Sequence, residues 1–386
     1  MNYDHHSKLS EKIQSQFTQA EDLCYLNHAA VSPWPKTTEQ AVTAFAHENR
    51  IYGAAHYPKW MSIEQQLRKH LATLINANSH TEIALAKSTS EALSIIAYGL
   101  NWEEGDEVII SDQEFPSNRI IWESLAQFGV KLRIAKITDN DPIQTFKEQL
   151  NANTKLISVS SVQYASGLQI DLLSLSQLCQ QNNILFCIDA IQSLGAIPLD
   201  QSIIQADFIV ADGHKWMMAA EGLALMYVKQ TLQDKLKLHQ FGWHMIKDKG
   251  QYDKLDWEPA EDATRFECGS PNMLGIHALH ASLELILGIG VDSIYQVLLQ
   301  KIDYLIDRLI EIPTLSFISS LEKGARSGII NFKIEGVDLP ELQAELMKRG
   351  VICAYRGGGI RFSPHFYTPE KTLDQAIEIL KDLITQ

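Results

Sequence analysis

Cysteine is scarce in this chain of 386 residues. The cysteines are odd in number and widely scattered, and they form no C-x-x-C pair and no cysteine–histidine spacing typical of zinc. We therefore expect no disulfide framework, no metal centre and a location in the reducing cytoplasm. The five positions are Cys24, Cys179, Cys187, Cys268 and Cys353.

Long apolar runs and basic charge are lacking as well. No stretch reaches the roughly 18–20 apolar residues of a membrane span, and residues 1–17 lack the apolar core of a secretory signal peptide. Lys and Arg number 33 against 47 Asp and Glu, which gives a net charge of -14. Such a charge repels a phosphate backbone. We expect neither a membrane nor nucleic acid as a partner.

What the sequence does contain is an alternation of apolar, β-branched runs with segments of helical period. The length predicts two or three domains at about 150 residues each. The alternation is typical of an α/β domain with a mainly parallel sheet. Strands are predicted over residues 107–110, 131–135, 156–159, 185–189, 208–211 and 223–228, and helices over 90–100 and 172–182.

The pattern changes after residue 272, where the order of elements indicates a smaller α+β domain. We assign residues 21–272 to a large domain, and residues 1–20 and 273–386 to a small one. A helix is expected over 7–20. In the C-terminal third, helices are predicted over 273–289, 297–311, 339–349 and 369–383, and strands over 328–334, 351–355 and 360–363.

Two candidate functional residues follow the ends of predicted strands. Asp189 ends one strand, and Lys215 comes shortly after another. In an open α/β sheet, ligands bind beyond the carboxyl ends of the strands. Pyridoxal phosphate requires such a pair, because a lysine forms its Schiff base and a carboxylate keeps its pyridine nitrogen protonated. The alternative is a solvated surface lysine and an aspartate that caps a helix.

A third junction between a strand and a helix carries three hydroxyl groups, on Ser88, Thr89 and Ser90. The free N–H groups and the dipole of a helix N-terminus bind phosphate. Alone, this is an ordinary capping cluster. Together with Asp189 and Lys215, it favours a site for a phosphate-bearing cofactor.

Several runs resemble the class V aminotransferase family of fold-type I pyridoxal-phosphate enzymes, which includes cysteine desulfurases, kynureninases and isopenicillin-N-epimerase-like proteins. The resemblance implies a large domain with a mainly parallel seven-stranded sheet between helices and a smaller α+β C-terminal domain. It covers most of the chain. The matching runs are residues 25–30 (YLNHAA), 90–92 (SEA), 114–118 (EFPSN), 186–195 (FCIDAIQSLG), 207–216, 265–272 (RFECGSPN) and 360–363 (IRFS).

The resemblance implies pyridoxal 5'-phosphate as cofactor and a role for each matching residue. Lys215 would form the Schiff base and then move protons, and Asp189 would pair with the pyridine nitrogen. The phenolic oxygen would be bound by Gln192, and the ring face would be covered by Phe115. The residues implied for the phosphate are Thr89, Ser90 and His214.

The resemblance also implies a homodimer and an amino-acid substrate. Gly269 and Ser270 would reach the phosphate of the partner subunit, and Arg361 would bind the substrate carboxylate through two parallel hydrogen bonds. Arg356 competes for the same role or binds a distal acidic group. The alternative to a substrate-binding role is that Arg361 is a surface arginine after a glycine-rich turn.

Two departures from the family pattern concern the cofactor site. Asp212 stands where desulfurases usually have a serine, and we expect its charge to turn away from the phosphate. The segment 160–167 is longer than in desulfurases, so either Ser161 or Gln163 approaches the cofactor.

The sequence predicts an enzyme that forms an external aldimine and a Cα carbanion, as a transaminase or an epimerase does. A kynureninase-like or desulfurase-like lyase is one alternative, and a non-catalytic regulatory protein that keeps the fold is another. The stretch from Arg356 to Arg361 is too short for a loop with a reactive thiol, and Cys353 lies in an apolar run. A persulfide-forming desulfurase is disfavoured, although Cys268 is harder to dismiss.

Overall fold

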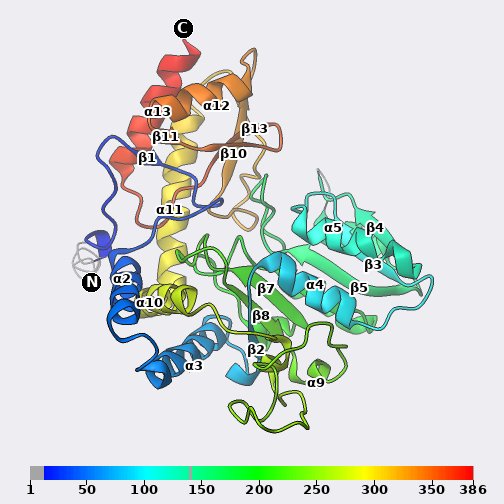
Figure 1. Cartoon of the computed structure of the whole chain (residues 1–386). Helices are drawn as coiled ribbons and strands as arrows, with labels where there is room; N and C mark the ends of the chain where they lie inside the picture. The colour runs from blue at the N-terminus through cyan, green and yellow to red at the C-terminus, as the bar shows by residue number, and fades with distance from the viewer. Residues whose placement is uncertain (1–12, 139–140, 386) are drawn as a thin grey trace, which may run out of the picture.

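A seven-stranded sheet forms the centre of the larger part of the molecule (Figure 1). The computed structural model describes residues 13–138 and 141–385. The strand order is β2-β8-β7-β6-β5-β3-β4, and only β8 runs antiparallel to its neighbours. The predicted mainly parallel seven-stranded sheet is therefore confirmed. Its strands are β2 (Ile83–Ala86), β3 (Glu107–Ser111), β4 (Lys131–Ala135), β5 (Thr154–Ser160), β6 (Leu185–Asp189), β7 (Phe208–Asp212) and β8 (Ala224–Val228).

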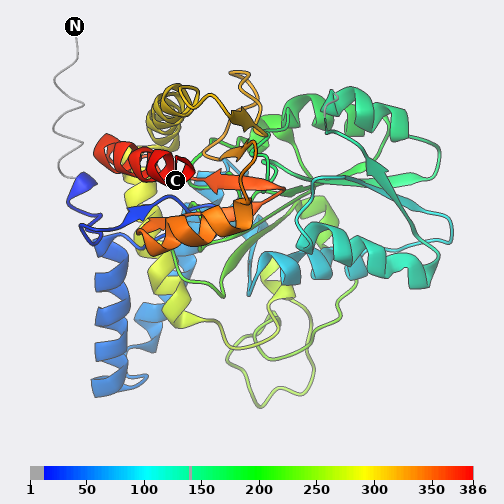
Figure 2. The same cartoon turned by 90° about the horizontal axis from the view of Figure 1, so that it is seen from above.

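Helices cover both faces of this sheet. Successive strand residues point to opposite faces, and the apolar side chains on each face form a core cluster with the helices there. Ile109 of β3 packs into one core cluster. Its neighbours Val108 and Ile110 pack into another, together with Trp122. Figure 2 shows the sheet between these layers. The first cluster includes residues of α3 (Tyr57–Leu74), α6 (Pro142–Gln149), α7 (Leu172–Gln181), α8 (Gln201–Ile204) and α10 (Met273–Ile289), and the second includes residues of α4 (Thr89–Gly99), α5 (Ser117–Glu123) and α9 (Gln230–Gln233).

A smaller antiparallel sheet, in the order β12-β13-β10-β9, lies with α11, α12 and α13 at the top of Figure 1. Cys24 and Leu26, from near the N-terminus, belong to its core. A parallel pair joins β1 to β11. The domain boundary at residue 272 stays a prediction. The elements are β1 (Cys24–Tyr25), α11 (Val291–Leu309), β9 (Leu315–Phe317), β10 (Ile330–Ile334), α12 (Leu339–Lys348), β11 (Val351–Ile352), β12 (Ala354–Arg356), β13 (Gly359–Phe362) and α13 (Glu370–Ile384).

Several elements are not predicted by the sequence pattern, namely α2 (Lys36–Tyr52), α3, β2, α5 and α6. Only one residue of α2, Thr38, is buried, so the helix has no broad buried face. Both α2 and α3 pack against α10 (Figure 1). The first part of the helix expected over 7–20 lies outside the described residues, and residues 17–20 have no regular structure.

Most predicted boundaries lie within two residues of those in the structure, and two elements differ more. The helix expected over 297–311 begins already at Val291, directly after Gly290, whose positive φ of 89° ends α10. The strand expected over 351–355 is divided into β11 and β12. Within the described residues no single helix has the length and apolar character to cross a membrane, although α10 and α11 pass that test as a pair bent by 81°.

Candidate active site

Eight of the ten predicted site residues line one cavity of about 330 Å³. The cavity lies where β6 and β7 end and α4 begins, and β13 of the small sheet closes it on another side. Gly269 and Ser270 are outside this lining and exposed, on the loop after the 3-10 helix Ala263–Phe266. The eight lining residues are Thr89, Ser90, Phe115, Asp189, Gln192, His214, Lys215 and Arg361.

The Lys215 amine is buried and free. It makes no hydrogen bond or ion pair within residues 13–138 and 141–385, and its Nζ lies 5.5 Å from the centre of the Phe115 ring. Burial, together with the positive charges of Arg361 and Arg356, lowers the pKa of Lys215 to about 8, against the attraction of Asp189 and Asp212. A substantial fraction of this amine is therefore neutral, and hence nucleophilic, near neutral pH.

Asp189 ends β6 beside this lysine. Its Oδ1 accepts a hydrogen bond from the Ile191 N–H at 3.0 Å. Burial raises the pKa of Asp189 well above its ordinary value, and the buried Glu114 carboxylate adds to this rise. A carboxylate of such high proton affinity is suited to share a proton with a ring nitrogen.

The low pKa of Lys215 predicts how fast cofactor-free protein takes up pyridoxal phosphate at different pH values. Only the neutral amine attacks the aldehyde. The rate should therefore rise about tenfold per pH unit below about 8 and level off above it. Stopped-flow absorbance between pH 6 and 10 measures this profile. In the variant Arg356→Gln the plateau should begin at higher pH, since a positive charge is lost. A rate that climbs steadily to pH 10 would contradict the prediction.

The N-terminus of α4 points its first turn into the cavity. Ser88 caps the helix by accepting the Glu91 N–H at 3.1 Å, and Glu91 Oε2 accepts the Lys87 N–H at 2.6 Å. The pair resembles a capping box, except that Glu91 accepts from the residue before the N-cap. It fixes Thr89 and Ser90 at the turn where exposed N–H groups and the helix dipole attract an anion.

Two further side chains that line the cavity, Ser117 and His214, lie at this end. Ser90 donates a hydrogen bond to Ser117 Oγ at 2.8 Å, and Ser117 also lines the cavity. His214 Nδ1 lies 3.0 Å from Asp212 Oδ1. From the sequence we expected the Asp212 charge to turn away from the phosphate. In the structure Asp212 instead lines the cavity and faces His214. The imidazole thus stands next to the charge that would otherwise repel a phosphate.

From the segment before α7, Tyr164 lines the cavity. The two residues expected there, Ser161 and Gln163, do not. Ser161 Oγ lies 2.7 Å from Ser193 Oγ, and Gln163 Nε2 donates to Glu114 Oε1 at 3.1 Å. Both side chains are buried in the protein. The Tyr164 ring packs edge-on against Phe115, with 5.2 Å between ring centres. The sequence marks this segment through its unusual length but does not show which side chain faces inward.

Gln192 is held from two sides at the cavity wall. Its Nε2 donates to the Ala29 carbonyl at 3.0 Å, and its Oε1 accepts from Trp216 Nε1 at 2.9 Å. An amide nitrogen has two hydrogens to donate. The second hydrogen of Nε2 is thus available to a ligand oxygen, in agreement with the role implied for Gln192.

Arg361 is a buried cation with neutral partners. Nη1 donates to the Tyr164 carbonyl at 2.7 Å and Nη2 to Asn27 Oδ1 at 3.3 Å, while Nε has no partner within the described residues. Its exposed fraction is 2%. Burial, together with the positive charge of Arg356, lowers the pKa of Arg361 to about 10. A buried guanidinium without a carboxylate fits an anionic ligand.

All five cysteines lie in the described residues, and none of them lines the cavity. Burial raises the pKa of the Cys353 thiol to about 12. Cys268 is partly exposed, and its Sγ lies 3.4 Å from Gln240 Oε1. The turn between Arg356 and Arg361 is a tight hairpin. The structure thus presents no thiol at the site.

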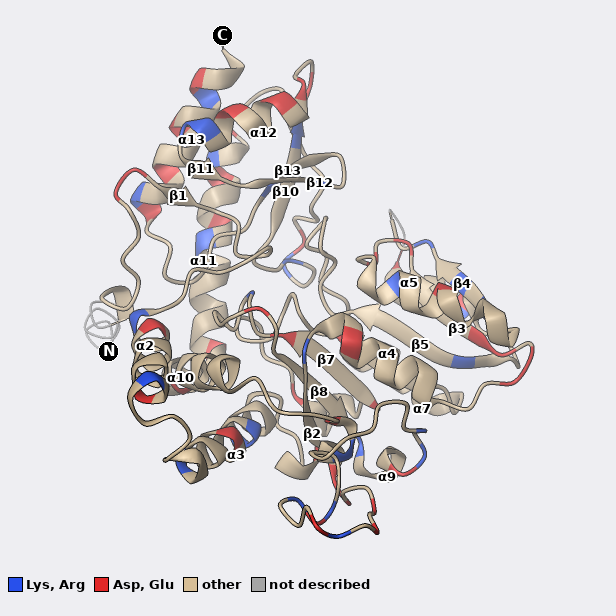
Figure 3. Ribbon diagram, in the orientation of Figure 1, with Lys and Arg blue, Asp and Glu red and all other residues tan. Residues whose placement is uncertain are grey.

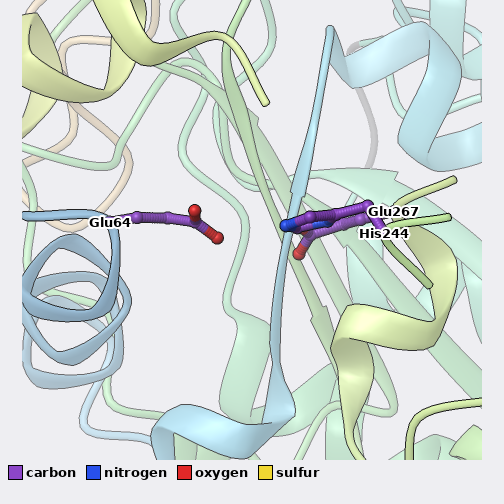
Figure 4. Close-up of side chains that lie close together, drawn as sticks. All are labelled: Glu64, His244 and Glu267. Atoms are coloured by element: carbon purple, nitrogen blue, oxygen red, sulfur yellow. The ribbon is translucent and has the colours of Figure 1, made fainter. Parts of the chain in front are cut away.

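A second group of titratable side chains lies away from this cavity and comprises Glu64, His244 and Glu267 (Figure 4). Arg68 stands between the two carboxylates: Nη1 is 2.5 Å and Nη2 2.8 Å from Glu267 oxygens, and Nη2 also pairs with Glu64. Neither nitrogen of the buried His244 has a hydrogen-bond partner within the described chain, although Nδ1 lies 3.7 Å from Glu267 Oε2. Because the Arg68 guanidinium already pairs with both carboxylates, we assign the cluster to the fold and not to a metal.

The residues of the cavity fit pyridoxal phosphate. A free buried amine stands beside a carboxylate of raised pKa, a capped helix N-terminus offers an anion site, and a buried arginine lacks an acidic partner. Charged residues elsewhere lie mainly on helices and loops (Figure 3). Fold and site together define a fold-type I pyridoxal-phosphate protein.

The chain belongs to the class V aminotransferase family, whose model matches residues 24–370. This confirms the family, fold type and cofactor that the sequence motifs imply. A probable cysteine desulfurase of Borreliella burgdorferi is 26% identical over 406 residues, which cover 98% of this chain and 94% of that protein. An uncharacterized aminotransferase of Bacillus subtilis, YcbU, is 25% identical over 374 residues, with coverage of 96% and 97%.

Among solved structures, C-DES has a similar fold. A C-DES variant with glycine covalently linked to its PLP cofactor has a TM-score of 0.89, 22% sequence identity, and coverage of 95% of this chain and 98% of its own. Another C-DES structure describes that protein as a cystine C–S lyase in complex with its product, cysteine persulfide. This likeness supports the fold.

Proposed function

We propose that this chain is a pyridoxal-phosphate enzyme that acts on an amino acid without a protein thiol, as a transaminase or epimerase-like enzyme. The observation that carries the proposal is the cavity itself, in which Lys215, Asp189 and Arg361 meet while no cysteine is present. A regulatory protein that only keeps the fold has no need for these three groups together.

Each residue has a defined task in this proposal. When bound, pyridoxal phosphate supplies an electron sink that stabilises negative charge at Cα. Arg361 binds the substrate carboxylate and orients the amino acid. Asp189 holds the proton of the pyridine nitrogen, and Lys215 Nζ accepts the Cα proton as the general base. Phe115 and Tyr164 form one side of the cavity, where their rings pack edge-on.

The return of the proton decides the product. Phe115 carries no acid–base group, so Lys215 is the side chain placed to move protons near it. Return of a proton to the opposite face of Cα would give the epimer. Transamination would instead leave the amino group of the substrate on the cofactor and release the keto acid once water hydrolyses the bond between them. A panel of L- and D-amino acids, with keto acid, epimer, ammonia and sulfide measured as products, tests the proposal. It fails if no amino acid changes the absorbance of the bound cofactor.

A lyase is a second candidate, favoured by the likeness to the cystine C–S lyase and by the relatives named cysteine desulfurase. A β-elimination also begins with removal of the Cα proton by Lys215, and the β substituent then leaves with its bonding electrons. It requires no protein thiol, which agrees with the cavity. Sulfide or persulfide formed from cystine or cysteine would favour this candidate.

The cysteines provide a test of the thiol-free proposal. We expect the double variant Cys268→Ala, Cys353→Ala to retain turnover within about twofold, because Cys353 has a strongly raised pKa and Cys268 lies outside the cavity. Steady-state rates on the best substrate of the panel measure this. A loss of more than about tenfold, with cofactor binding intact, would point to a persulfide mechanism instead.

The homodimer also remains part of this proposal. Gly269 and Ser270 are exposed on a loop away from their own cavity, a position that leaves them free to contact another subunit. In the proposed dimer they complete the phosphate site of the partner. The cofactor affinity of Ser270→Ala, compared with the parent at equal dimer content, tests this assignment.

A further inference from the structure

The cavity holds two arginines that come from one hairpin. Arg356 ends β12, Arg361 lies in β13, and the two strands are antiparallel, with Arg356 opposite Gly359. The turn residues Gly357 and Gly358 have positive φ angles of 55° and 80°. Both arginine side chains line the cavity. Two positive charges therefore face the same small space.

Neither charge is neutralised by the protein. Arg361 binds only neutral oxygens, and Arg356 Nη1 donates to the Tyr355 carbonyl at 2.8 Å. No carboxylate of the described chain forms an ion pair with either. The exposed Arg50 on α2 also lacks one. Every other arginine forms an ion pair, namely Arg68, Arg119, Arg133, Arg265, Arg308, Arg326 and Arg349.

The hairpin holds Arg356 in a fixed position. Asn331 Nδ2 donates to the carbonyl of Arg356 at 2.8 Å and to that of Ala165 at 3.0 Å. A Cβ on Gly359 would lie 2.2 Å from Asn331 Oδ1, and one on Gly357 would lie 2.8 Å from the Ala165 side chain. The backbone that carries Arg356 is thus packed and preorganised, which lowers the entropic cost of binding.

The cofactor phosphate does not account for these two charges. Its anion site is built by the N-terminus of α4 and by His214, and Asp189 serves the pyridine nitrogen. One anion, the substrate α-carboxylate, satisfies the buried Arg361. Arg356 lies at the exposed rim of the same cavity without an ion-pair partner, a position from which its guanidinium can bind a second anion.

We propose that the substrate is an amino acid whose side chain ends in an acidic group. Arg361 binds its α-carboxylate, and Arg356 binds the distal carboxylate, sulfinate or phosphate. This inference rests on the proposed function, because it names the substrate class of the same site. Charge-assisted hydrogen bonds from a guanidinium to such groups are among the stronger polar contacts in proteins.

The experiment compares acidic amino acids with their neutral counterparts on the enzyme loaded with cofactor. The pairs are L-glutamate with L-glutamine, L-aspartate with L-asparagine, L-cysteine sulfinate with L-cysteine, and O-phospho-L-serine with L-serine. Apparent Kd values come from the absorbance of the bound cofactor. In at least one pair the acidic member should bind about tenfold more tightly, and the preference should shrink at high salt. The pair with the largest ratio identifies the distal group.

Two variants assign the preference to Arg356. Arg356→Gln should bring the ratio close to one, while Arg356→Lys should keep part of it. The matched control is Arg349→Gln, which removes an equal charge from an exposed arginine at the end of α12 that pairs with Asp382 at 3.6 Å. It should leave the ratio unchanged.

The possible results separate the two proposals. If neutral members bind as tightly as acidic ones, or if Arg356→Gln keeps the ratio, the inference about substrate class is wrong and the proposed function stands. If no amino acid changes the absorbance of the normally bound cofactor, the proposed function fails and the inference fails with it.

Discussion

Replacing Lys215 with alanine should abolish the covalent link to pyridoxal phosphate and lower turnover by on the order of 10³-fold or more. The variant loses the amine that forms the link and also the general base, and a positioned base alone contributes about 10²–10⁴-fold. Borohydride reduction followed by mass spectrometry of the tryptic peptides locates the modified lysine in the parent. Absorbance and turnover then show the loss in the variant.

The control for this experiment is Lys59→Ala. Lys59 is an exposed lysine of α3 that pairs with Glu48 at 3.0 Å, far from the cavity lining. It should keep both the covalent cofactor and the turnover of the parent. A reducible adduct on Lys215→Ala, or full turnover by it, would remove the basis for the central assignment.

The second large effect concerns stability. Arg68→Leu should lower the free energy of unfolding by about 3–5 kcal/mol, because it leaves two buried carboxylates without their cation. Glu64 and Glu267 have side-chain exposures of 1% and 5%, and Glu267 also accepts the Leu85 N–H at 2.9 Å. The cluster therefore joins α3 to β2 and to the loop before Gly269. Urea unfolding of the enzyme loaded with cofactor measures the change.

Two further variants separate the lost ion pair from a general effect of the substitution. Arg119→Leu removes an exposed arginine that pairs with Glu123 at 2.7 Å, and it should cost less than about 1 kcal/mol. Adding Glu267→Gln to Arg68→Leu removes one of the stranded charges and should restore part of the stability. Equal losses in Arg68→Leu and Arg119→Leu would show that the buried pair contributes little.

Most strands of the large sheet could be predicted from sequence because their apolar runs are buried on both faces. Leu185–Asp189 matches the prediction at both ends. The edge strand Lys131–Ala135 also matches at both ends although it is mostly exposed, whereas the short buried strand β2 is not predicted. In contrast, α2 packs on α10 with only Thr38 buried, so few of its residues mark an inward face. The start of α11 at Val291 depends on Gly290. The positive φ of this one residue ends α10, and α11 begins directly after it.

For the candidate site, the residues at strand ends could be predicted, since the carboxyl ends of neighbouring parallel strands meet at one edge. Asp189 and Lys215 follow this rule. Tyr164 and Ser117 do not, because their inward direction is set by the packing of the segments that carry them. The unpaired state of Arg356 likewise depends on contacts that only the folded chain shows.

The pairing of β1 with β11 has a consequence for how the protein folds. Cys24 lies beside Val351 and Asn27 beside Ser363, contacts that span more than three quarters of the chain. Ala29 and Ala30, which line the cavity, follow directly on this segment. Contacts of such long sequence separation form slowly. During synthesis β1 therefore stays without its strand partner until residues 351–352 have been made, after every strand of the large sheet.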